Sequence, residues 1–174
     1  TQLRRSPGVD FSVDIQAGER KLHSCWIIPE RGSWIELTVT KKDVLAVRID
    51  QSGKFSAVTF LRALTESLST DQDVLRTCYS TAVDKKQKTQ TQNAFAKSIT
   101  NKIAVGDIVV LKTGEVLVAS GQPISETAAL EIAASDLAEV EVIEAEMENL
   151  DTLILNTLRE DTCKSHGDAL LKIY

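Results

Sequence analysis

Hydrophobic and polar positions in the first third of the chain follow patterns typical of strands joined by tight turns. The segments HSCWII (23–28) and WIELTVT (34–40) are rich in β-branched and aromatic residues, and the second partly alternates, which predicts strands. Between them, Pro29 and Gly32 are turn formers, so we expect a hairpin with PERGS as its loop. VLAVRID (44–50) predicts another strand, ended by the turn QSGK. Pro7-Gly8 predicts an earlier turn.

Helical spacing of apolar residues begins after these strands. In SAVTFLRALTESL (56–68) the leucines follow a helical period, although two β-branched residues favour a strand, and we predict a helix from about Val58. A second helix is expected after Ser69 or Thr70, either of which can cap it. LDTLILNTLRED (150–161) and GDALLKIY (167–174) also have helical spacing.

The middle of the chain contains a polar segment followed by a small module. Residues 84–102 are basic and poor in apolar residues, which predicts a mobile loop or a marginal helix with a solvated face. Residues 103–145 then predict a β-β-α-β submodule, with a hairpin around Gly114 and a helix from Ser125 to about Ser135. The whole pattern predicts an α+β fold with a twisted, mainly antiparallel sheet and a few helices.

Charge is distributed unevenly along the 174 residues. The net charge of −5 argues against a surface coated with nucleic-acid-binding groups. Residues 1–62 nevertheless contain clustered Arg and Lys, while residues 123–151 carry nine carboxylates and no Lys or Arg. One end of the protein could therefore face a polyanion while the other faces solvent.

No residue pattern indicates chemistry carried by this chain alone. A phosphate-binding glycine loop, a nucleophile elbow and a DxDxD-type metal motif are all missing from the sequence. The three cysteines are widely spaced, which favours reduced thiols. His23 and Cys25 together with Cys163 and His166 could be drawn as a zinc site, but their spacing matches no standard pattern. We therefore expect no catalytic residue, no metal site and no cofactor in this chain, and no apolar run approaches the length of a membrane span.

Several motifs together resemble one family. QLRRSPGV, IIPERGSWIEL, KDVLAVRID, FLRAL, NTLRED and DALLKIY follow one another in the order found in the β subunit of bacterial RNA polymerase. The resemblance runs the length of the chain, and RSPGV with IIPxRGSW and VRID is a specific combination. Residues 1–174 are thus identified as similar to the lobe (β2) domain of that subunit, and because the first residue is not Met we interpret the chain as a piece of a longer one.

The resemblance implies a function in transcription. The lobe would form one wall of the DNA cleft, facing the non-template strand and the downstream duplex. DNA-directed RNA synthesis, a nucleotidyl transfer, would need the whole complex, with Mg²⁺ bound by another subunit. Implied partners are DNA, the β′, α and ω subunits and σ factor, and the implied location is the cytoplasm, at the nucleoid. An alternative is a protein-interaction surface that docks σ factor or transcription regulators, with the acidic residues 123–151 as its candidate.

Site residues carried over by the resemblance lie in the first third of the chain. Arg5 would line a pocket for an unstacked non-template base, and Trp34 would stack on the neighbouring base, although a core position for Trp34 is the alternative. Gln2 would lie at the edge of the rifamycin pocket, most of which is outside this chain. The remaining candidates for DNA contact are Arg31, Arg48 and Lys54. For Arg48, Lys54 and Arg62, structural salt bridges are an equal alternative.

The chain also departs from the family pattern. Asp10 and Glu30 stand where the family usually has aromatic residues, and DQSGKFSA (50–57) replaces a more basic run. These changes remove positive charge or add negative charge near the proposed DNA face. Trp26 occupies a position without a fixed aromatic in the family, and we expect it in the core.

Overall fold

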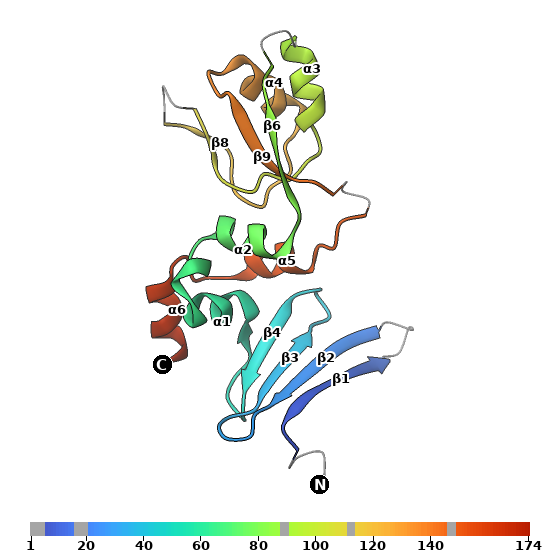
Figure 1. Cartoon of the computed structure of the whole chain (residues 1–174), viewed down its shortest axis with the longest axis vertical. Coiled ribbons are helices and arrows are strands. Elements are labelled where there is room, and N and C mark those ends of the chain that lie inside the picture. The colour runs from blue at the N-terminus through green and yellow to red at the C-terminus, as the bar shows by residue number, and fades with distance from the viewer. Residues whose placement is uncertain (1–5, 16–20, 88–90, 111–113, 146–148) are drawn as a thin grey trace. The chain divides into compact units, whose positions relative to one another are not determined.

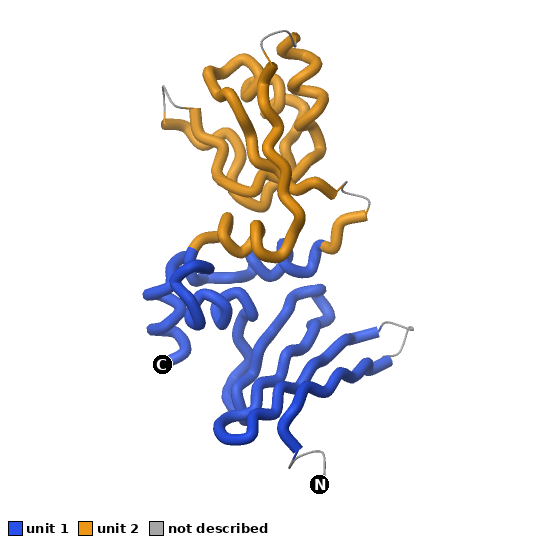
Figure 2. Tube along the Cα trace, in the orientation of Figure 1, with its two compact units in different colours: residues 1–69, 152–174 blue, residues 70–151 orange. Residues whose placement is uncertain are grey.

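The described residues form helices and separate antiparallel sheets, so the predicted α+β class is confirmed (Figure 1). The computed structural model describes residues 6–15, 21–87, 91–110, 114–145 and 149–174. Contacts divide the chain into two compact units, which Figure 2 colours separately. Unit 1 consists of Thr1–Ser69 and Thr152–Tyr174, and unit 2 consists of Thr70–Asp151.

An antiparallel sheet dominates unit 1. Within the described residues its strands lie in the order of the chain, and they are β1 (Gly8–Ile15), β2 (Lys21–Ile28), β3 (Ile35–Val39), β4 (Leu45–Ile49) and β5 (Phe55–Ser56). The predicted hairpin is confirmed, because Ile27 pairs with Ile35 across the loop that contains Gly32. Gly32 has φ of +112°, a conformation that side chains with a Cβ rarely adopt.

Strand β1 was not predicted. Gly8 is its first residue, so the turn predicted at Pro7-Gly8 gives way to a strand. In its sequence, GVDFSVDI, apolar residues alternate with polar ones, which is the period-two signal of a strand. The side chains of Val9, Phe11, Val13 and Ile15 are all about half exposed or more, so in this structure the apolar face of β1 is open.

Helices pack beside the sheet in unit 1. They are α1 (Ala57–Leu64), the 3-10 helix η2 (Glu66–Leu68), α5 (Leu153–Glu160) and α6 (His166–Ile173). The helix predicted from Val58 is confirmed as α1, and the Ser56 hydroxyl caps it by accepting a hydrogen bond from the Val58 N–H. Helices α1 and α5 both contact β4, where Val47 is completely buried. The core of unit 1 therefore joins residues from both ends of the chain.

Unit 2 has its own core. Its elements are α2 (Asp71–Cys78), β6 (Thr81–Lys85), α3 (Gln92–Ile99), β7 (Ile108–Val109), β8 (Val116–Val118), α4 (Glu126–Ala134) and β9 (Glu139–Ile143). Thr70 caps α2 in a full capping box, and Ser125 caps α4 as predicted. Helices α3 and α4 pack together over apolar residues that include Phe95 and Ile132. The last predicted strand is confirmed as β9, and it pairs with β6.

Of the two alternatives predicted for residues 84–102, the helix is confirmed over Gln92–Ile99, but its apolar face is buried, which the polar composition did not indicate. Strand β6 ends at Lys85, and helix α3 buries Phe95, Ala96 and Ile99 in the core of unit 2. Few apolar residues suffice there because they all fall on one face of a short helix. Lys102 of this segment is held by a contact within unit 2, since its ammonium lies 2.8 Å from an Asp84 carboxylate oxygen.

Candidate nucleic-acid interface

One face of the unit 1 sheet is polar and open. The register places Asp10, Trp26, Glu36 and Arg48 in one row across β1, β2, β3 and β4. The next row along the same face contains Ser12, Ser24, Thr38 and Ala46. Because side chains alternate between faces along a strand, the apolar residues of β1 lie on the opposite face. Trp26, an exposed aromatic side chain, therefore lies among polar neighbours.

Trp26 and Trp34 contact each other on this polar face. Their ring centroids are 6.1 Å apart, and the ring planes meet at 62°, an edge-to-face arrangement. Trp26 is 37% exposed, so the prediction of a core position for Trp26 was wrong. Trp34 is half-buried, and it too lies outside the core. The pair presents aromatic surface to solvent.

Asp50 fixes the backbone at Trp34. The Trp34 N–H donates a hydrogen bond of 2.8 Å to an Asp50 carboxylate oxygen, and the Asp50 N–H donates one of 2.8 Å to the Trp34 carbonyl. Hydrogen bonds from the Ser33 hydroxyl and from the Trp34 N–H hold the pKa of the Asp50 carboxyl below its usual value. Asp50 itself has φ of +51°, which Asp tolerates better than most residues. The residue that follows β4 thus anchors the backbone of Trp34, the residue that precedes β3.

Basic side chains lie around the tryptophan pair. Arg31 is exposed in the hairpin loop. The Lys54 ammonium is exposed and donates a hydrogen bond of 3.1 Å to the Thr38 hydroxyl. The Arg48 guanidinium lies 3.8 Å from a Glu36 carboxylate oxygen, so part of its charge is balanced within the sheet. The local charge is therefore mixed, with the acidic groups nearest Trp26.

Two open hollows flank the tryptophans. One, of about 650 Å³, is lined by both tryptophans together with Gly32, Arg48 and Asp50, among others. The other, of about 600 Å³, is also lined by both tryptophans, and it extends along β1 and reaches Lys54. Each is large enough for a nucleotide-sized group. The aromatic pair is the feature that both hollows share.

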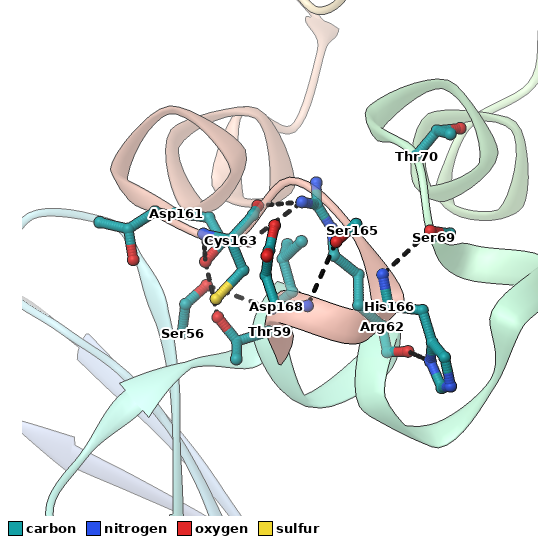
Figure 3. Close-up of polar contacts among 12 residues, drawn as sticks. Ser56, Thr59, Arg62, Ser69, Thr70, Asp161, Cys163, Ser165, His166 and Asp168 are labelled. Carbon is teal, nitrogen blue, oxygen red and sulfur yellow. Dashed lines mark hydrogen bonds and ion pairs between the residues drawn. The ribbon is translucent and has the colours of Figure 1, made fainter. Parts of the chain in front are cut away.

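Two predicted site residues, Gln2 and Arg5, lie outside the described residues. Arg62 is described, and of its two predicted roles, DNA contact or a structural salt bridge, the structure supports the salt bridge. Its side chain is completely buried, 3.7 Å from the equally buried Asp161 carboxylate, and it also donates to the Cys163 carbonyl (Figure 3). The Thr59 hydroxyl donates a hydrogen bond of 2.6 Å to Asp161. This cluster joins α1 to the segment after α5 and supports the fold of unit 1.

The acidic segment predicted as a docking surface makes ion pairs inside unit 2. The Arg76 guanidinium donates to both carboxylate oxygens of Glu141, at 2.8 and 2.6 Å. Bonds from Arg76 and Gln72 hold the pKa of Glu141 below its usual value. Glu139 lies 3.6 Å from the Lys85 ammonium. The docking alternative stays a prediction, and two of its carboxylates already have cationic neighbours.

The part of the chain that the structure describes contains no cluster of metal ligands, and the pKa of two of its thiols is raised rather than lowered. There, no three His, Cys, Asp or Glu side chains lie together as metal ligands. Cys25, Cys78 and Cys163 are free thiols, and burial raises the pKa of Cys25 and Cys78. Among the described helices, none has the length and apolar character needed to cross a bilayer.

Comparison with known proteins places the chain in a family. The family model described as RNA polymerase Rpb2, domain 2 matches residues 5–115, more than half of the chain. The chain therefore belongs to this family.

Full-length relatives have names that agree with this assignment. Proteins named DNA-directed RNA polymerase subunit beta match all of the chain, with 45% identity in Rhodopirellula baltica and 31% in both Leptospira biflexa and Phocaeicola vulgatus. The chain spans 14% of the length of each of these three relatives. The similarity of the chain to the β subunit, predicted from its motifs, is confirmed.

Reasoning from sequence missed the positions of two residues near this candidate interface. No catalytic or metal-binding motif marks Asp50, yet it binds the backbone of Trp34. Trp26 was assigned to the core, although its neighbours two positions away, Ser24 and Ile28, share its face, and one of them is polar. The alternation in β2 could have suggested an open face, but only the cross-strand register brings Asp10 and Glu36 beside Trp26.

Proposed function

We propose that this chain is the lobe of the β subunit of a bacterial RNA polymerase and forms part of the wall of the DNA cleft. In this proposal its polar sheet face contacts the unpaired non-template strand and the downstream duplex. Membership of the Rpb2 domain 2 family and similarity to full-length β subunits support the proposal. DNA binding by this chain is our inference from the residues on that face.

The observation that carries the proposal is the half-exposed Trp34 with a doubly anchored backbone. A rigid aromatic ring on an open polar face can stack on any unpaired base, because every base has a π face, and such stacking contributes about 1–3 kcal/mol per base. The exposed Arg31 and Lys54 are suited to nearby phosphates. Arg48 would contribute less, because Glu36 partly balances its charge.

Catalysis in this proposal belongs to the whole complex. The lobe guides DNA, while nucleotidyl transfer takes place around Mg²⁺ bound by another subunit, so the partners are DNA, the β′, α and ω subunits and σ factor. The complex would act in the cytoplasm, at the nucleoid. Arg5 would line the pocket for the base next to the one on Trp34, and Gln2 would lie at the rifamycin-pocket edge.

The test is a whole polymerase whose β subunit contains this chain with Trp34→Ala. Loss of one stacking contact of about 1–3 kcal/mol should shorten the lifetime of the open promoter complex by about 5- to 150-fold. Trp34→Phe keeps a ring at the same place and is the matched control, which should retain most of the lifetime. An unchanged lifetime with Trp34→Ala would show that Trp34 is not a DNA contact.

A further inference from the structure

Trp26 is an exposed aromatic residue whose position is not explained by packing. It lies on the polar face of the sheet, with Asp10 and Glu36 directly opposite it on the neighbouring strands and Ser24 two residues before it. Leu22 and Ile28 share this face with Trp26, while Cys25 and Ile27 point to the other face. Ile28 is buried on this face, whereas Trp26 keeps 37% of its surface exposed, so packing leaves much of the Trp26 ring open to solvent.

The two tryptophans together form a corner with two aromatic surfaces. The centroid distance of 6.1 Å and the angle of 62° mean that the two rings are not stacked on each other. Both hollows on this face are lined by both rings. Nonspecific single-strand-binding surfaces use such neighbouring aromatics for successive bases.

We propose that Trp26 is a second stacking residue, which holds the unpaired non-template base adjacent to the base on Trp34. This inference rests on the proposed function, because it presumes that this face meets unpaired DNA. Trp26 contributes a surface of its own rather than only supporting the ring of Trp34. Since the ring planes are inclined by 62°, the bound strand bends between the two bases.

Charge around the corner decides which part of the nucleotide Trp26 meets. Asp10 and Glu36 flank Trp26 and would repel a phosphate at this point. Thr38 lies in the next row of the sheet along this face, and its hydroxyl accepts a hydrogen bond from the Lys54 ammonium. A cation is therefore available farther along the same hollow. Trp26 therefore binds a base, while Lys54 binds the backbone.

This division gives two separable signatures. Substitution of Trp26 should weaken binding without changing its dependence on salt, because no counterion is released by a stacked base. Lys54→Ala should instead reduce the slope of log affinity against log salt by about one unit. If Trp26 only supported the fold, its substitution would not weaken binding at one particular base.

The experiment couples protein variants to single missing bases. Open complexes of the whole polymerase are formed on promoters whose non-template strand carries one abasic nucleotide at successive unpaired positions. For the unmodified enzyme, lifetime should fall by about fivefold or more at two adjacent positions. Trp34→Ala should abolish the penalty at one position, and Trp26→Ala should abolish it at the adjacent one, as expected for direct contacts in a double-mutant cycle.

Matched variants separate stacking from folding. Trp26→Phe keeps an aromatic ring and should keep the penalty at its position, whereas Trp26→Leu keeps apolar volume and should lose it. If Trp26→Ala changed the penalty only at the position assigned to Trp34, Trp26 would be a support for that ring and the inference would be wrong. If neither tryptophan coupled to any base, the proposed function of this face would fail as well.

Discussion

The buried pair of Arg62 and Asp161 should be among the most sensitive points of the fold. Both side chains are 0% exposed, and their charged atoms are 3.7 Å apart. We predict that Asp161→Asn, which keeps the shape and removes the charge, destabilises unit 1 by about 3–5 kcal/mol, because it leaves a buried guanidinium without its counterion. Typical domains have only about 5–15 kcal/mol of stability, so this loss is large.

Urea unfolding followed by tryptophan fluorescence measures this loss directly. Both tryptophans lie in unit 1, so the signal reports on the unit that contains the ion pair. With a denaturant slope of about 2 kcal/mol per molar urea, the midpoint should fall by about 1.5–2.5 M.

The neighbouring residue provides a matched control. Glu160→Gln removes the same charge one position earlier, from a side chain that is 52% exposed and 3.4 Å from the Lys42 ammonium, 76% exposed. That change should cost at most about 1 kcal/mol. Equal midpoints for Asp161→Asn and Glu160→Gln would refute the reasoning. Replacing both partners, as Arg62→Met with Asp161→Leu, should restore much of the stability lost in the single variant.

Further predictions concern the hairpin, its anchor and unit 2. In a Trp26→Phe background, the fluorescence of Trp34 should change on acidification only below the usual pKa of Asp, because the hydrogen bonds to Asp50 keep its folded-state pKa lowered. The stabilisation that ionised Asp50 gives the fold is fully present above the pKa of Asp in the unfolded state. It is lost as the pH falls through the lower pKa of Asp50 in the folded state. Gly32→Ala should destabilise unit 1 by about 1 kcal/mol or more, measured by urea unfolding, because φ is +112° there. Thr70→Ala should cost about 1 kcal/mol through loss of the capping box, measured as a lower thermal midpoint in circular dichroism.

Each of these predictions has a matched comparison. Asp50→Asn removes the titrating carboxyl, so a persisting acid transition at Trp34 would point to another group. Gly53→Ala changes a glycine without a positive φ and with open space around its Cβ, and an equal cost at both glycines would contradict the conformational argument. Thr70→Ser keeps a capping hydroxyl and should retain most of the stability.

Strong local signals were readable in the sequence because they depend on neighbouring residues. The hairpin around Gly32, the strand that contains Val47, and the caps at Thr70 and Ser125 all follow from turn chemistry, alternation and capping. The ordered motifs also identified the family, which comparison confirmed. Helix α3 was predicted only as one of two alternatives, because its packing against α4, across about 30 residues, decides its stability more than its composition does.

By itself, then, the sequence determined the fold class, most elements and the family, since each of these is written in local patterns or in motif order. Only the tertiary structure decided the surroundings of the key side chains. It placed Asp50 on the backbone of Trp34, Trp26 on an open polar face, and Asp161 beside Arg62. These contacts join residues 8 to about 100 positions apart. Cross-strand register and packing between the two ends of the chain set them, and no local pattern contains that information.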